Sequence, residues 1–460
     1  MMGLRPRLRA SFVLLLALCW LCIGTPPTGA TPTAPDAASV SSFAAAVGGS
    51  QFGLDTHIAT RFGIYGRQSG PMDMAQSSGA GWIREEVRWD WIQHPIGAWD
   101  WGFTDEMVQD ARNRNLNILG LLGYNNSAQK AGTVNFTVPD IGLWKTFVLN
   151  TVYHYKDRIH VWEVWNEPDN PYFWQGSVAD YVNLLRETYN TIKSVDPTAV
   201  VMNGAASNLD LNWFNQFLDQ GGAQYADILG FHPYPSRASV DNGDYWKNDL
   251  AHFKEIQART GKSWWFTEIG WSSASGDGVG SEQAQASYMV RQYVESLDYP
   301  GLDVRHIFWY DFHDDGTDPG NRENNYGLIR NDWATPKFSY LAYRQMTAHL
   351  SGATPQGTVD AGAGTAYRVV RDGTVVDVLW GSGHAGLPTA SGQAQAFDMG
   401  GNALPVDVSG GQIHLDIGGD PVFVEHTGGP VPALPPLPSG QSYTLPAHTP
   451  DLPPGYASHR

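Results

Sequence analysis

The chain has 460 residues, 18 of them Trp and only 2 of them Cys, and its 29 Lys and Arg residues stand against 46 Asp and Glu, a net charge of −17. At roughly 150 residues per domain, this length allows one large domain and a smaller one. Two Cys exclude a disulfide scaffold and most Cys-based zinc sites. The acidic balance argues against a nucleic-acid partner. The many Trp fit either a large core or a surface that stacks on flat ligands.

The N-terminus carries the signs of an export signal. Residues 1–30 hold Arg residues followed by an apolar stretch of roughly twelve residues, which is too short to span a membrane. Residues 31–49 are rich in Thr, Pro and Ala, which predicts a flexible linker. We therefore expect a secreted or extracellular protein without a membrane segment once the signal is removed. The oligomeric state is left open.

Apolar strand-like runs alternate with amphipathic helical stretches over residues 50–350. The eight strand candidates are Gln51–His57, Trp82–Val87, Asn117–Gly123, His160–Asn166, Ala199–Asn203, Ile228–His232, Ser263–Ile269 and His306–Phe312. The clearest helical patterns are Thr104–Asn113, Ile141–Tyr155, Val178–Val195, Asn212–Gln220, Asn248–Thr260, Ser281–Leu297 and Lys337–Leu350. Eight such units predict a (β/α)8 TIM barrel of the α/β class. A doubly wound sheet is the rival, but no Gly-rich phosphate turn follows the first strand.

The pattern changes after the predicted barrel. Short β-prone runs alternate with Gly turns over residues 355–427, which predicts a small antiparallel, β-sandwich-like domain. Residues 428–460 are rich in Pro and are expected to form a disordered tail.

Two predicted strands end in a carboxylate with aromatic neighbours. Glu167 leaves its strand just before Pro168, and Glu268 lies in the run Trp264 to Trp271. Strand alternation predicts that Glu163, Trp165 and Glu167 share one face. Glu163 lies deeper and is not chosen as a catalyst. Two carboxylates across a pocket are what glycoside hydrolysis needs, one protonated and one ionised. The sequence supplies the pair but no distance between them.

Five segments in chain order resemble one family. They are Trp82–Ile92, Asn166-Glu167-Pro168, Gly230–Pro235, Thr267-Glu268, and Phe308–Asp311 with Asn325–Leu328. Together they resemble the clan A retaining glycoside hydrolases over residues 50–350. Family 39 and its endo-acting exopolysaccharide-hydrolase relatives are the nearest type, with cellulase-like family 5 members second.

The resemblance implies a role for each carboxylate and its neighbours. Glu167 would be the acid/base and Glu268 the nucleophile. Asn166 would bind the sugar 2-hydroxyl. Arg84 would lie beside Glu268 and keep it ionised, a role for which Arg88 is the competitor.

Three further residues would complete the substrate site. His232 and Tyr234 lie on the same side of their run, and one of them would bond Glu268 or the sugar. Trp309 would be the floor on which the sugar ring packs. No metal or cofactor is required, and the run His313-Asp314-Asp315 is interpreted as a solvated loop rather than a metal cluster.

The function expected from this combination is a secreted retaining glycosidase that cleaves β-glycosidic bonds. Endo action on a polysaccharide is preferred to exo action, because aromatic residues are frequent in the loops that would rim a cleft. These are Trp89, Trp91, Trp99, Trp101, Tyr124, Tyr172, Phe173, Trp174, Tyr245 and Trp246. An exo-acting, xylosidase-like enzyme, a transglycosylase and a non-catalytic carbohydrate-binding protein remain open alternatives.

Overall fold

The computed structural model describes residues 50–426, apart from 64–65, 94–96, 128–134, 208–210, 235–244 and 277, together with residue 438. The predicted signal, linker and C-terminal tail therefore lie outside the described residues, residue 438 apart. Within the described part of the chain, no helix combines the length and the apolar character needed to cross a bilayer.

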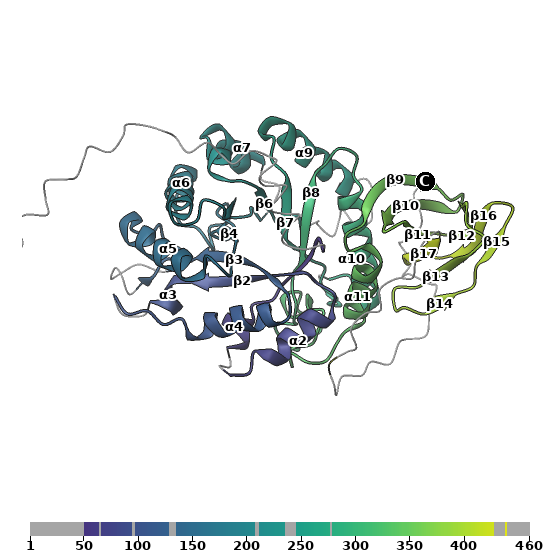
Figure 1. The fold of residues 1–460 in the computed structure, drawn as a ribbon, viewed down its shortest axis with the longest axis horizontal. Helices are drawn as coiled ribbons and strands as arrows, with labels where there is room; N and C mark the ends of the chain where they lie inside the picture. Colours follow the sequence, from purple (N-terminus) through teal and green to yellow (C-terminus); the bar gives the residue numbers. More distant parts are fainter. Residues whose placement is uncertain are drawn as a thin grey trace, which may run out of the picture.

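Eight parallel strands form the predicted barrel (Figure 1). Their order is β5-β4-β3-β2-β1-β8-β7-β6, and parallel bridges from Met202 to Ile228 and from Ala206 to Phe231 join β5 to β6. The expected TIM-barrel class is thereby confirmed. The strands are β1 (Phe52–Asp55), β2 (Trp82–Arg88), β3 (Asn117–Gly123), β4 (Val161–Val164), β5 (Val200–Asn203), β6 (Leu229–Phe231), β7 (Trp264–Ile269) and β8 (Val304–Trp309).

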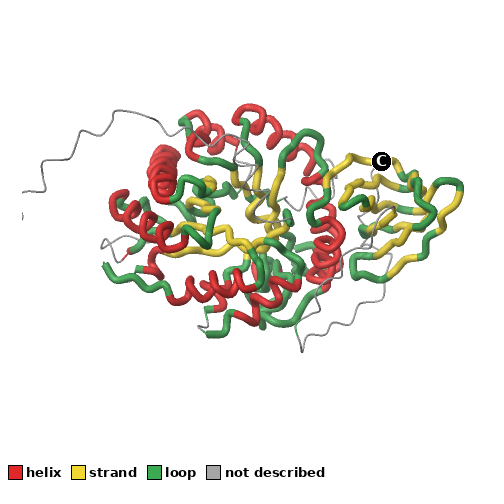
Figure 2. Tube along the Cα trace, in the orientation of Figure 1, coloured by secondary structure: helices red, strands yellow, loops and turns green. Residues whose placement is uncertain are grey.

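Helices surround the barrel (Figure 2). Polar N-caps begin several of them, such as the capping box of Ser177 and Asp180 on α6. The helices are α2 (Ser69–Ser77), α3 (Trp89–Ile92), α4 (Gly102–Asn113), α5 (Ile141–Tyr155), α6 (Val178–Val195), α7 (Leu211–Asp219), α9 (Tyr245–Thr260), α10 (Glu282–Leu297) and α11 (Phe338–Leu350), with the short segments η1 (Ile58–Phe62), η3 (Gly222–Tyr225) and η4 (Glu323–Asn325). The sequence patterns had not indicated α2 and α3.

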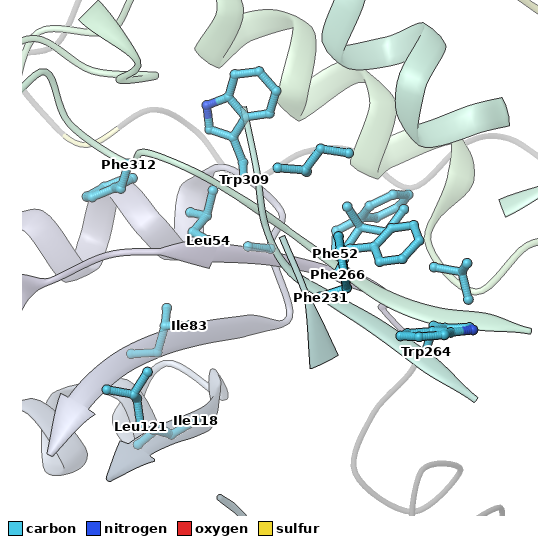
Figure 3. Packing of buried hydrophobic residues seen from close by; sticks show 14 of the residues in the cluster. Phe52, Leu54, Ile83, Ile118, Leu121, Phe231, Trp264, Phe266, Trp309 and Phe312 are labelled. Carbon is cyan, nitrogen blue, oxygen red and sulfur yellow. The ribbon is translucent and has the colours of Figure 1, made fainter. Parts of the chain in front are cut away.

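The barrel has two apolar layers. One cluster fills the barrel interior and includes Trp82, Trp265 and Phe308. The larger cluster lies between the strands and the helices, and Figure 3 shows part of it, including Trp264 and Trp309. Successive strand residues contribute to different layers, as Phe308 and Trp309 do, because side chains alternate along a strand.

Two antiparallel sheets follow the barrel beside α10 and α11 (Figure 1). One sheet has the order β14-β13-β17-β11-β10-β9, and the other β12-β16-β15. Tyr367 donates to Glu295 of α10 at 3.1 Å, and His349 of α11 contacts Glu425 at 2.8 Å. The strands are β9 (Thr354–Asp360), β10 (Gly364–Arg371), β11 (Thr374–Gly381), β12 (Gly383–Pro388), β13 (Ala394–Phe397), β14 (Ala403–Leu404), β15 (Asp407–Ser409), β16 (Gln412–Ile417) and β17 (Val422–His426).

Candidate active site

The chain leaves β4 in an unusual backbone conformation. The strand ends at Val164, and Trp165 and Glu167 have φ of 72° and 43°. Such left-handed values cost non-glycine residues of order 1–3 kcal/mol and cluster at functional sites. They also break the strand alternation. Trp165 is therefore fully buried in the outer apolar layer, so the prediction that it shares a face with Glu163 and Glu167 is wrong. Glu163 and Glu167 both reach the catalytic end, as predicted.

An irregularity in β7 positions the second carboxylate. The register against β8 shifts between Phe266 and Ile269, with three steps along β7 against two along β8. An extra residue in one strand re-aims the side chains around it. As a result the adjacent residues Thr267 and Glu268 both reach groups at the catalytic end, where regular alternation would have separated them.

Arg84 is the centre of the site. Its side chain is 2% exposed and projects from β2. Nε donates to Glu163 at 2.7 Å, and Nη1 donates to Asp55 at 2.8 Å and to Glu268 at 2.7 Å. Nη2 donates to Oδ1 of Asn166 at 2.8 Å. One buried cation thus joins the ends of β1, β2, β4 and β7.

Glu268 has the surroundings of an ionised carboxylate. Besides Arg84 on Oε1, the hydroxyl of Tyr234 donates to Oε2 at 2.8 Å. Asn166 is bound to the same arginine, because its Oδ1 accepts a hydrogen bond from Nη2 of Arg84. The Nδ2 group of Asn166 is therefore the donor that it can offer to a sugar hydroxyl. Arg88 instead pairs with Asp90, so the structure places Arg84 and not its competitor beside Glu268.

Glu167 faces Glu268 across a short gap. One carboxylate oxygen of each, together with a ring nitrogen of His232, lie within 4.8 Å of one another. Oε2 of Glu167 accepts from Nδ2 of Asn170 at 2.9 Å, and Oε1 is 3.0 Å from Nδ1 of His232. Retaining glycosidases separate their carboxyl groups by about 5–5.5 Å and inverting ones by about 6.5–9.5 Å. An oxygen–oxygen separation below 4.8 Å is on the retaining side of this division.

A buried hydrogen-bond chain runs from Glu167 into the barrel. Nε2 of His232 is 3.1 Å from Oγ1 of Thr267, which lies 3.2 Å from Oε1 of Glu163. The Glu163 carboxylate, paired with Arg84, can only accept, so the Thr267 hydroxyl donates to it. Nε2 of His232 then carries the ring proton and donates to Thr267. Burial lowers the pKa of His232, so the ring is neutral and Nδ1 is a bare acceptor.

The hydrogen-bond partners of Glu167 and Glu268 favour different protonation states of the two carboxyl groups. Burial raises the pKa of both Glu167 and Glu268 to about 7, and nearby donors and cations oppose the rise. A bare Nδ1 accepts a hydrogen bond from protonated Glu167 and repels the ionised form. Arg84 and Tyr234 stabilise the ionised form of Glu268. These partners favour the proton on Glu167 and the negative charge on Glu268.

The structure contradicts the prediction that Trp309 forms the floor under the sugar ring. Trp309 is fully buried in the apolar cluster of Figure 3. Its ring packs toward Tyr293 of α10, and its Nε1 donates to the Tyr326 carbonyl oxygen at 3.2 Å. The side chain points to the helix layer, so it cannot be the sugar floor. The next residue, Tyr310, is partly exposed, and its ring lies 6.1 Å from that of Tyr234. Two consecutive residues at the end of β8 therefore differ in environment: Trp309 lies in the core and Tyr310 lies at the site.

The predicted aromatic rim is also only partly present. Trp89 and Trp174 are buried, and Trp99 stacks on Trp101, which stacks on His154. Trp91 is partly exposed and Tyr172 is 81% exposed. The side chains of Tyr245 and Trp246 lie outside the described residues. Most of the Trp residues in the described part of the chain therefore belong to the core.

Several site residues received no role in the sequence analysis. Asp55 and Thr267 bind groups already singled out, and each lies at or near a strand end, which was the available signal. Asn170 lies three residues after Glu167. Glu85 accepts from the backbone nitrogens of Ile58 and Ala59 and so fixes the loop after β1.

Two groups in the described part of the chain have the spacing of metal ligands. One is Glu167, His232 and Glu268, and the other is Asp311, His313 and Asp315. In the second group, Nη1 of Arg61 lies 2.6 Å from Asp311 and 2.9 Å from Asp315, so a guanidinium already supplies the positive charge between them. That no metal is required stays a prediction.

The fold and the site together define a class that comparisons with known proteins identify. Residues 145–336, which include both carboxylates, match the family model described as glycosyl hydrolase catalytic core. A β-xylosidase from Caldicellulosiruptor saccharolyticus is 26% identical over 214 residues, 43% of each chain. The chain thus matches less than half of that relative's length.

Solved structures place the fold more narrowly. A family 39 glycoside hydrolase from Bacteroides cellulosilyticus has a TM-score of 0.67 at 24% identity, covering 82% of this chain and 80% of its own. A family 39 β-xylosidase from Caulobacter crescentus has a TM-score of 0.65 at 18% identity, covering 83% and 97%. Residues 145–336 thus resemble a glycosyl hydrolase catalytic core, and the fold resembles that of family 39 glycoside hydrolases. Its expected resemblance to family 39 is confirmed.

The chain from Glu167 to Glu163 predicts a specific pH effect. In Thr267→Val, His232 loses its acceptor at Nε2, so its proton moves to Nδ1 and stabilises ionised Glu167. The pKa of the acid then falls, and the basic limb of the kcat/KM profile moves to lower pH by about one unit, the size of one hydrogen bond to a charged group. A pH profile measures this shift. Thr191→Val, which removes the hydrogen bond of a buried hydroxyl to the Glu187 carbonyl oxygen, should leave the limb in place.

Proposed function

We propose that the protein is a retaining β-glycosidase. The observation that carries this proposal is the carboxylate pair, with oxygens of Glu167 and Glu268 within 4.8 Å of one another and with different hydrogen-bond partners. This is the spacing at which one carboxylate attacks carbon directly.

The first step forms a covalent intermediate. An oxygen of ionised Glu268 attacks the anomeric carbon, the bond to the leaving oxygen breaks, and the proton of Glu167 passes to that oxygen. Tyr234 and Arg84 hold Glu268 in place, and the amide of Asn166 is available for the sugar 2-hydroxyl. The positive charge that develops on the sugar ring is stabilised by the excess of buried carboxylates around Arg84.

The second step releases the sugar. Glu167, now ionised, takes a proton from a water whose oxygen attacks the anomeric carbon, and the bond to Glu268 breaks. Two displacements at one carbon restore the original β configuration. The pair returns to its singly protonated state, so no group outside the site has to supply or remove a proton.

The preferred substrate in this proposal is a β-linked polysaccharide outside the cell, attacked at internal bonds. The N-terminal sequence supports export. The β-xylosidase relatives favour the alternative of exo action on a xyloside. Transfer to a sugar acceptor uses the same intermediate. A purely binding protein has no need for a strained Glu167 opposite a second carboxylate, which counts against that class.

Proton NMR of the first products tests the proposal. A β-linked oligosaccharide is digested, and the anomeric signals are recorded before mutarotation. We expect the β-anomer to appear first and the α-anomer to grow in later. An initial α product would overturn the two-step mechanism.

A further inference from the structure

A pocket lies at the ends of β1 and β2, where Glu86 of β2 lines it. It has a volume of about 310 Å³, at the lower end of the range of small-molecule sites. The loop after β1 forms one wall and the loop after β2 the other. Its polar and aromatic lining includes Glu86, Arg88, Trp91, Asp100 and Phe103.

Buried polar contacts connect this pocket to Glu268. Glu86 lies 3.9 Å from Nδ1 of His57, and Nε2 of His57 lies 3.2 Å from Asp55. Asp55 shares the Arg84 guanidinium with Glu268, at 2.8 and 2.7 Å. The side chains of His57, Asp55 and Arg84 thus lie between Glu86 and Glu268. Glu86 also lies two residues after Arg84 on β2, so both side chains are on the same face of the strand and the pocket begins beside the Arg84 site.

The lining has the chemistry of a neutral sugar site. Trp91 is partly exposed, Phe103 meets it edge-on at 6.1 Å, and the Arg88 guanidinium lies 5.8 Å above its ring. Arg88 is itself neutralised by two hydrogen bonds to Asp90, at 3.0 and 2.8 Å. Glu86 and Asp100 therefore leave the pocket with acceptors for hydroxyl groups and with a negative balance that disfavours acidic sugars.

The position of Glu167 fixes the side of the cleft on which this pocket lies. The acid must face the leaving oxygen, so the leaving sugar lies toward the loop after β4, where Tyr172 is 81% exposed. The sugar retained on Glu268 extends the other way, toward the ends of β1 and β2. Glu86 of β2 lies there.

We propose that this pocket binds a second, neutral β-linked pyranose on the retained side of the cleaved bond. The inference rests on the proposed glycosidase function and deepens it, because it assigns two consecutive sugars to the retained side. The substrate class is then a chain of neutral β-linked sugars, cleaved at least two rings from its non-reducing end. An enzyme that removes single terminal sugars has no use for such a pocket.

Matched aryl glycosides test the pocket. The probes are 4-nitrophenyl β-xyloside with its β-xylobioside, and 4-nitrophenyl β-glucoside with its β-cellobioside. For the pair that wild type cleaves, we expect kcat/KM to be at least tenfold higher on the bioside. Trp91→Ala should lower kcat/KM on the bioside about tenfold and change it less than twofold on the monoside, and Trp91→Phe should restore most of the loss.

Trp380→Ala is the matched control. Trp380 is also partly exposed and also lies below a guanidinium, that of Arg291 at 5.2 Å, but it belongs to β11 outside the barrel. It should leave both substrates unchanged, and thermal unfolding of both variants separates misfolding from loss of binding. Equal kcat/KM on monoside and bioside in wild type, or an equal loss on both in Trp91→Ala, would show that the pocket binds no second sugar. Either result would leave the proposed glycosidase activity standing.

Calorimetry separates this inference from the proposed function. If none of the four aryl glycosides is cleaved, the proposed function fails. Calorimetric binding of xylobiose and cellobiose then tests whether the pocket binds a sugar. Binding that weakens about tenfold in Trp91→Ala supports the pocket. Binding that is unchanged in that variant, or absent in wild type, overturns it.

Discussion

Arg84→Met is expected to lower the free energy of unfolding by about 3–5 kcal/mol, because removal of one partner leaves buried charges uncompensated. Asp55, Glu163 and Glu268 all lose their cation, and each of the three is less than 10% exposed. Activity should fall together with stability, by at least a hundredfold in kcat/KM, since Glu268 is then harder to keep ionised at neutral pH.

Urea unfolding and steady-state kinetics measure these two losses. Arg305→Met is the matched control, since its pair with Asp303 is exposed and such surface pairs contribute about 0–1 kcal/mol. If Arg84→Met unfolded like Arg305→Met, the arginine would not be the centre of the site. Arg84→Lys should recover part of the stability, because it restores the charge but not the hydrogen bonds to all four partners.

Glu167→Gln is expected to reduce activity in a way that depends on the leaving group. For an oligosaccharide, whose sugar oxygen needs a proton to depart, kcat/KM should fall by about 10²–10⁴-fold, the usual contribution of general acid catalysis. For a 4-nitrophenyl glycoside, kcat/KM should fall much less, because nitrophenolate leaves without protonation.

The ratio of kcat/KM on the two substrates is the informative quantity. Glu187→Gln, a change at a surface carboxylate paired with Lys145, should leave this ratio unchanged. Equal losses on both substrates in Glu167→Gln would show that the residue is structural or acts in another step. The pH profile of Glu167→Gln should also lose its basic limb, because the group that must stay protonated is gone.

The arrangement of the barrel could be read from the sequence because it depends on long, regular patterns. Eight strand-like runs and the helices between them were identified, and the short helices α2 and α3 were not. The site residues Glu167, Glu268, Arg84, His232 and Tyr234 came from a resemblance carried by several motifs in order. The structure brings those five together through direct hydrogen bonds or shared partners.

The errors lie where the backbone departs from regular structure. Strand alternation failed at Trp165, where φ is positive. It also could not foresee that an extra residue in β7 aims both Thr267 and Glu268 at the site. Trp309 was assigned to the sugar although Tyr310, one residue later, is the partly exposed ring. An error of one residue in a predicted strand end assigns a core side chain to the cleft, because side chains alternate along a strand. Sequence patterns locate such strand ends poorly.

Azide rescue tests the central claim, that Glu268 attacks the sugar while Glu167 acts as acid and base. Glu268→Ala is assayed with an activated aryl β-glycoside in the presence of sodium azide, and the product is identified by NMR. Azide in the space of the missing carboxylate should restore turnover and give the α-glycosyl azide. The same experiment on Glu167→Ala should give the β-azide, formed on the covalent intermediate. A β-azide from Glu268→Ala, or no rescue of that variant, would contradict the account.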